Sequence, residues 1–247
     1  MRENPLVQKC LGGHSAMMMR KVLETLLVAG ALCMIVTTAQ AQDYRIFMTG
    51  GGSNLFDSRI FTSTAGFQYR TDYAYGGKFT IGFESPHGKV LGIEASYAVG
   101  HDNLLVTGVT INPTEAGYGI WNHRASLNLV AHAPKRILRV QPYLTAGVEF
   151  DRFSPTHAAV NQVTAEGFTG TAAVLEHDNK VGFNYGGGIE WKLVRFIALR
   201  FDARDHVTGS PTFGLKSQTS GGRPIFSVSG LAQNVEYSAG IVFRFKK

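Results

Sequence analysis

The stretch from Asn234 to Phe245 reads N-V-E-Y-S-A-G-I-V-F-R-F. Every second residue from Val235 to Phe245 is apolar or aromatic, whereas the residues between them are mostly polar, small or charged. Side chains alternate between the two faces of a strand, so one face of this strand meets an apolar phase and the other a polar one. A half-buried strand of a soluble sandwich has the same alternation. The length favours a membrane strand, because soluble strands usually have about five or six residues and membrane-crossing strands about nine to eleven.

The same alternation recurs in segments that are joined by connections of alternating length. Upstream of the last strand we expect seven further strands, at 44–52, 72–84, 89–99, 118–132, 138–153, 179–191 and 196–206. The connections run long, short, long, short, long, short and long, which is the pattern of an up-and-down barrel with both ends of the chain on one side. The sequence therefore predicts an all-β fold, an eight-stranded antiparallel up-and-down transmembrane β-barrel.

The two parities differ in charge, and this predicts which face meets lipid. Placing one arginine on the lipid face costs about 2–4 kcal/mol at the bilayer midplane, so the charged parity must face inward. Since an eight-stranded barrel is just wide enough for side chains to fill, opposite charges would pair across it. Together with Glu84, the predicted structural lumen charges are Lys78, Glu94, Arg124, Glu149, Asp151, Glu190, Arg200, Asp202, Arg204, Glu236 and Arg244. Aromatic residues expected to form a girdle on the lipid face are Tyr73, Phe83, Phe150, Trp191 and Phe245.

The N-terminal region has the three parts of a secretory signal peptide. Arg20 and Lys21 precede an apolar run from Val22 to Thr38, and an A-x-A motif follows at 39–41. We therefore expect residues 1–41 to be an upstream extension plus a cleaved signal peptide, and residues 42–247 to be the barrel domain. Both cysteines, Cys10 and Cys33, precede the predicted cleavage point, which leaves no disulfide or thiolate site in the mature chain.

The charge of the mature chain is modest. Of the 24 basic residues four precede Gln42, and of the 18 acidic residues two do, which leaves a net charge of +4. The basic residues are scattered along the sequence, so we expect no nucleic-acid partner.

Three motifs carry a resemblance to a known family. They are P-Y-L-T-A-G-V-E-F at 142–150, G-G-G-I-E-W at 186–191 and Y-S-A-G-I-V-F-R-F at 237–245. In these the chain resembles the OmpA-type small outer-membrane β-barrels. The resemblance implies a place in the outer membrane of a Gram-negative-type bacterium, contact with the lipid bilayer and lipopolysaccharide, and insertion by the barrel-assembly machinery, which recognises an aromatic chain end. It also implies a monomer, and it gives no functional residues to carry over.

The sequence offers little for catalysis or for cofactor binding. The pair His123 and Ser126 has a spacing of three, which puts the two side chains on opposite faces of a strand, so they cannot act as base and nucleophile. The histidines after Gln42 have no tight ligand spacing, and we expect them to be solvated in turns, loops and strand ends: His87, His101, His123, His132, His157, His177 and His206. We expect no catalytic, cofactor or metal site, and rank an enzyme acting on lipid A lowest.

Two non-enzymatic functions stay open. In the first, the barrel is a scaffold whose four outer loops contact other surfaces through a ligand that the sequence does not reveal. In the second, it is a narrow porin-like channel for small solutes. Eight strands and a charge-filled interior favour the scaffold.

Overall fold

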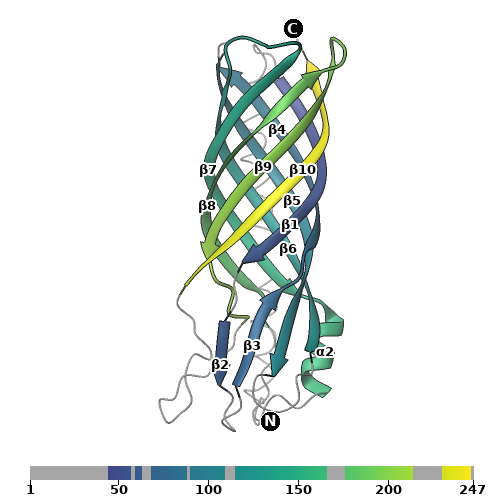
Figure 1. Ribbon diagram of the computed structural model, residues 1–247, viewed down its shortest axis with the longest axis vertical. Coiled ribbons are helices and arrows are strands. Elements are labelled where there is room, and N and C mark those ends of the chain that lie inside the picture. Colours follow the sequence, from purple (N-terminus) through teal and green to yellow (C-terminus); the bar gives the residue numbers. More distant parts are fainter. Residues whose placement is uncertain are drawn as a thin grey trace, which may run out of the picture. The chain divides into compact units, whose positions relative to one another are not determined.

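Figure 1 shows the computed structural model of the chain. The structure describes residues 44–56, 59–62, 68–87, 90–108, 115–165, 176–213 and 230–245. The predicted signal peptide, with Cys10 and Cys33, lies outside the described residues.

Eight long strands close into an antiparallel barrel, which confirms the predicted fold. Each pairs with the next around the barrel, and β1 pairs with β10 to complete the ring. This closure gives the backbone N–H and C=O groups partners in the neighbouring strands, which the interior of a bilayer requires. The strands are β1 (Tyr44–Phe56), β4 (Gly76–His87), β5 (Leu91–Gly108), β6 (Glu115–His132), β7 (Val140–Pro155), β8 (Asp178–Lys192), β9 (Ile197–Gly209) and β10 (Leu231–Phe245).

The two ends of the barrel differ. At one end, called here the turn end, short connections join β4 to β5, β6 to β7 and β8 to β9, and β10 ends (top in Figure 1). At the other, the loop end, lie the longer connections with the hairpin of β2 and β3 and the helix α2. In transmembrane barrels short turns lie at the periplasm and long loops outside, which gives the barrel its orientation.

Several strands are longer toward the loop end than the sequence pattern predicted. β5 continues to Gly108 and β6 starts at Glu115, so most of the predicted link 100–117 is strand. β3 (Gln68–Tyr73) pairs with the extension of β5 and with β2 (Arg59–Thr62). The predicted second strand is therefore interrupted between Tyr73 and Gly76, and Tyr73 is buried, so its placement in the girdle was wrong.

The helix α2 (His157–Ala165) lies within the predicted link 154–178. Its first turn is capped by Thr156, whose hydroxyl oxygen accepts a hydrogen bond from the Ala159 amide at 3.1 Å. Among the described residues, no helix is long and apolar enough to cross a membrane.

The outward face of the barrel is apolar, as the alternation predicted. Leu129, Leu144 and Val148 are among its most exposed side chains. Phe150, Trp191 and Phe245 are exposed on this face, and Tyr44 stacks on Phe83 and Phe245 at the turn end, with ring centroids 6.0 and 4.7 Å apart. Such aromatic residues mark the membrane–water interfaces.

At the loop end an apolar core closes the barrel interior. We call this core the apolar cap; it comprises Leu55, Tyr73, Leu104, Tyr118, Ile120, Phe153, Ala159, Phe213 and Ala232. It joins the barrel strands, β3, α2 and the segment after β9 in a single core, with the Phe153 and Phe213 rings edge to face at 6.5 Å. Burying apolar surface in this way stabilises the connections of the loop end.

The turn between β6 and β7 differs slightly from the prediction. Val140 pairs with Ile137 across a tight turn, so β7 begins two residues after the predicted start at Leu138. Both central residues have positive φ, 49° for Leu138 and 75° for Arg139. This geometry is that of a two-residue hairpin turn, which glycine and asparagine adopt more readily than Leu and Arg.

Candidate functional site

The barrel interior holds all twelve predicted lumen charges. Each is at most 9% exposed, and Glu84, Glu94, Asp151 and Glu190 are fully buried. They come from every barrel strand except β1, always from the parity opposite to the apolar one. Buried charges are costly unless paired, so their partners determine what the interior can do. The charges group into three layers along the barrel.

The middle layer comprises Glu94, Arg200, Asp202 and Arg204. Glu94 accepts hydrogen bonds from Arg200 Nη2 at 2.7 Å and from Arg204 Nη1 at 2.8 Å. Asp202 accepts from Arg200 Nε at 2.6 Å and from Arg204 Nε at 3.1 Å. Two guanidinium groups thus alternate with two carboxylates, and the layer is electrically neutral.

Two aromatic rings complete this layer. The Arg200 guanidinium lies 4.2 Å from the centroid of Phe47 and 4.6 Å from that of Tyr143. Stacking of this kind stabilises a desolvated cation. A methyl group at Gly82 would overlap the Phe47 ring, and one at Gly188 would overlap Tyr143, so these inward glycines leave room for the two rings.

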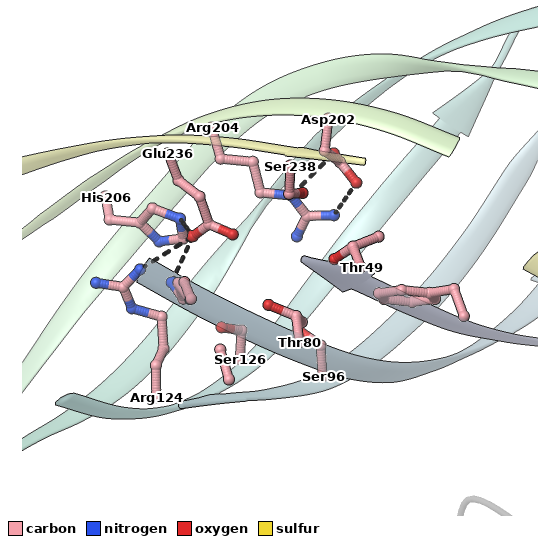
Figure 2. A pocket seen from close by; sticks show the side chains of 13 residues that line it. Thr49, Thr80, Ser96, Arg124, Ser126, Asp202, Arg204, His206, Glu236 and Ser238 are labelled. Atoms are coloured by element: carbon pink, nitrogen blue, oxygen red, sulfur yellow. Dashed lines mark hydrogen bonds and ion pairs between the residues drawn. The ribbon is translucent and has the colours of Figure 1, made fainter. Parts of the chain in front are cut away.

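The loop-side layer comprises Lys78, Arg124, Glu149, Asp151, His206 and Glu236. Lys78 pairs with Glu236, and Arg124 Nε donates to Asp151 at 2.7 Å. His206 lies between two carboxylates, with Nδ1 2.6 Å from Glu149 and Nε2 3.1 Å from Glu236. Figure 2 shows Arg124 and His206 converging on Glu236. The layer combines three carboxylates with the side chains of Lys78, Arg124 and His206.

The turn-side layer comprises Arg45, Glu84, His132, Glu190 and Arg244. Arg45 Nη1 lies 3.1 Å from Glu84 Oε1 and 3.7 Å from Glu190 Oε1, and Arg244 pairs with Glu190. Together with the other two layers, this layer lines the interior with paired charges between the turn end and the apolar cap.

Two histidines were predicted to be solvated, and that prediction was wrong. His132 is 4% exposed and His206 is 2% exposed. Both occupy inward positions of their strands, in phase with Asn128 and Arg204, so the parity could have revealed them. Their carboxylate partners lie on other strands, which spacing along the sequence does not show.

A small polar cavity separates the middle and loop-side layers. It has a volume of about 20 Å³ and is lined by Lys78, Arg204 and Glu236 and by hydroxyl groups (Figure 2): Thr49, Thr80, Ser96, Ser126 and Ser238. This volume fits a single water molecule. Ser126 borders this cavity from inside, whereas His123 lies on the outer face and contacts the Tyr97 hydroxyl at 2.8 Å. His123 and Ser126 therefore lie on opposite sides of the barrel wall, as their spacing of three predicted.

An apolar outer face, a closed sheet and a charge-paired interior define a transmembrane β-barrel. The chain belongs to the outer membrane protein beta-barrel domain family, whose sequence model matches residues 26–245. It is accordingly an outer-membrane protein of the Gram-negative type. No curated protein matches the sequence.

Solved structures of small outer-membrane barrels are similar in fold. OprG from Pseudomonas aeruginosa is 14% identical, with a TM-score of 0.58, 84% of this chain and 97% of that chain covered. Outer membrane protein AlkL, solved in lipid bilayers, is 15% identical, with a TM-score of 0.47 over 83% of this chain and 91% of that one. Neisserial surface protein A is 13% identical, with a TM-score of 0.47 and coverage of 82% and 97%. The likeness to OprG concerns the fold.

Proposed function

We propose that this protein is a non-enzymatic scaffold of the outer membrane, closed to ions, whose loop end presents a surface for partners. The observation that carries the proposal is the filled interior. Three layers of paired charges and the apolar cap lie in series between the turn end and the loop end.

Permeation through this interior would require the ion pairs to open. Breaking a buried pair by removing one partner costs about 3–5 kcal/mol, because the remaining charge is left uncompensated. An ion crossing the barrel would meet this cost at Glu94–Arg200 and again at Arg124–Asp151. The cavity of about 20 Å³ between these pairs is too small for a hydrated ion.

The loop end supplies the second argument. The apolar cap packs β3, α2 and Phe213 together with residues of the barrel strands. Binding residues usually lie on connections that a rigid frame positions. The loop end therefore has the organisation that a binding surface needs, and its ligand is a matter for experiment.

The lipid partners follow from the outer face. We propose that the apolar band contacts lipid chains and that the outward-facing aromatic residues contact the headgroup regions, which on the loop-end side are those of lipopolysaccharide. All eight barrel strands have a neighbour on each side, so the barrel wall has no open edge with which a second chain could pair, and we propose a monomer that the barrel-assembly machinery inserts.

Single-channel recording of the refolded protein in planar bilayers tests the proposal. We expect no steady openings at 100 mV once flotation with liposomes and heat-modifiable gel migration have verified insertion and folding. The matched control is the double variant Glu94→Ala, Arg200→Ala, which empties half of the middle layer and should raise the frequency of openings. Steady, ion-selective openings of the unaltered protein would overturn the scaffold proposal in favour of a narrow channel.

A further inference from the structure

Three potential metal ligands converge in the turn-side layer. They are Glu84, His132 and Glu190, all buried, and their ligand atoms lie within 4.8 Å of one another. They come from β4, β6 and β8, so the barrel wall fixes them from three directions. Zn²⁺ binds imidazole nitrogen and carboxylate oxygen at about 2.0–2.2 Å, so a shift of about 1 Å would bring the three atoms around a single ion.

Arg45 Nη1 occupies the centre of this group. The contacts among Arg45, His132 and Glu84 cannot all be hydrogen bonds at the same time. Arg45 Nη1 lies 2.7 Å from His132 Nε2 and 3.1 Å from Glu84 Oε1, and His132 Nε2 lies 2.8 Å from the same Glu84 Oε1. If Nε2 carries a proton, two donors face each other at Arg45; if it carries none, two acceptors face each other at Glu84. A divalent cation in the place of Arg45 Nη1 would make all three contacts attractive.

Unused polar atoms give an independent indication. Glu84 Oε2, Glu190 Oε1 and His132 Nδ1 are buried without a hydrogen-bond partner among the described residues. Glu190 pairs with Arg244 through Oε2, and its Oε1 lies 3.7 Å from Arg45 Nη1 at the centre of the group. Glu84 and His132 meet Arg45 through their other atoms, Oε1 and Nε2, so Glu190 Oε1 is the unsatisfied atom that faces the centre of the group. Buried polar groups usually have partners, and an unsatisfied carboxylate oxygen there points to a ligand.

His206 shows that this geometry is not general for the buried histidines. It too has two carboxylates nearby, but Glu149 contacts Nδ1 and Glu236 contacts Nε2. The two acids therefore lie on opposite edges of the ring and cannot share an ion with a single nitrogen. At His132, by contrast, the acids gather on the Nε2 side.

We propose that Glu84, His132 and Glu190 form a binding site for a divalent transition metal such as Zn²⁺, in which Arg45 is a displaceable internal cation. One imidazole and two carboxylates suit Zn²⁺ and leave a fourth position open for water. The Arg45 side chain is 15% exposed near the turn end, so it can turn outward to the periplasmic side when the metal enters. Arg244 stays on Glu190 and limits the net charge of the occupied layer.

Calorimetric titration of the refolded full-length barrel with Zn²⁺ at pH 7.5 tests the proposal. We expect one saturable Zn²⁺ per chain. Arg45→Ala should bind at least tenfold more tightly, since the competing cation is gone, and His132→Ala at least tenfold more weakly. His206→Ala is the matched control, expected within twofold of the unaltered protein.

Gel migration before and after heating verifies that each variant is folded, and Glu190→Gln, which keeps the side-chain shape, replaces His132→Ala if the latter does not refold. Three outcomes would each overturn the site: no saturable binding by the unaltered barrel, affinity in His132→Ala or Glu190→Gln equal to the unaltered one, or no gain in Arg45→Ala. Zn²⁺ that remains bound in His132→Ala belongs to surface histidines.

Discussion

Arg200 on β9 and Glu94 on β5 meet inside the barrel, with Nη2 2.7 Å from Oε2, although 106 residues separate them in the sequence. Arg200 is 1% exposed and Glu94 is fully buried. Arg204 and Asp202 extend the pair to a neutral group of four, so neither charge lies alone in the low-dielectric interior.

Arg200→Ala should therefore destabilise the barrel strongly. Glu94 and Asp202 would each lose one cationic partner, at a cost of about 3–5 kcal/mol. Urea unfolding of the protein in micelles measures the change. Arg152→Ala is the control. Because Arg152 is exposed on β7, its replacement should change the free energy of unfolding by less than about 0.5 kcal/mol. Equal effects in the two variants would contradict the role given to the middle layer.

Substitutions in the β6–β7 turn are expected to raise the free energy of unfolding. Leu138 and Arg139 have positive φ, which is costly for residues with a Cβ atom. The double variant Leu138→Asn, Arg139→Gly has the residues that this turn prefers and should raise the free energy of unfolding by about 1 kcal/mol. Leu138 is 90% exposed, so little packing is lost. A lower urea midpoint in this variant than in the unaltered protein would show that the two side chains stabilise the turn.

We expect the apolar cap to stabilise the connections at the loop end without being needed for the stability of the barrel. Phe213 is 1% exposed and lies at the edge of this cap, so Phe213→Ala removes an anchor of the segment after β9. We expect protease cleavage at the loop end at least tenfold faster, with heat-modifiable migration unchanged. Phe196→Ala, at an exposed site of the turn end, should leave both readouts as they are. An unchanged rate of cleavage in Phe213→Ala would show that the apolar cap does not hold the loop end in place.

One carboxylate near the cap predicts a pH dependence of the loop end. Asp178 begins β8 opposite Phe153, outside the membrane-spanning part of the strand. Partial burial raises its pKa, but hydrogen bonds from the Thr212 amide and hydroxyl, at 2.5 and 3.0 Å, together with Lys180, hold it below its usual value. A depressed pKa means that the contact stabilises the folded loop above the unfolded pKa of about 3.9 and is lost as the pH falls below it.

Amide exchange of Thr212 measures this effect. Its protection factor should be constant from pH 7 to pH 5 and fall as Asp178 becomes protonated below about pH 4. In Asp178→Asn the protection should be low and independent of pH over the same range. Protection of Thr212 in Asp178→Asn equal to that in the unaltered protein at pH 7 would contradict the contact.

The sequence predicted the barrel and the orientation of its side chains well, because both follow from local alternation. Glu149 and Arg244 are inward for the same reason that Val148 and Phe245 are outward: strand periodicity fixes their relation. Where the chain leaves the membrane, the alternation no longer predicted which way a side chain points. Tyr73 continues the aromatic parity of β4 in sequence, but it lies on β3 and packs into the apolar cap.

The candidate metal site could not be predicted from the sequence, for a different reason. Glu84, His132 and Glu190 lie on three strands, and the barrel register alone brings them together. In addition, Arg45 lies in the predicted strand 44–52, but Phe47 shares its parity, so the pattern did not mark that face as charged.

The orientation of adjacent residues tests the central claim most directly. Methyl-labelled protein in lipid nanodiscs gives nuclear Overhauser contacts between side-chain methyl groups and lipid acyl chains. Leu129 and Ile241 are exposed on the outer face, whereas their neighbours Val130 and Val242 are fully buried inside. We expect acyl-chain contacts for Leu129 and Ile241 and none for Val130 and Val242. Acyl-chain contacts of equal strength at Val130 or Val242 would contradict it.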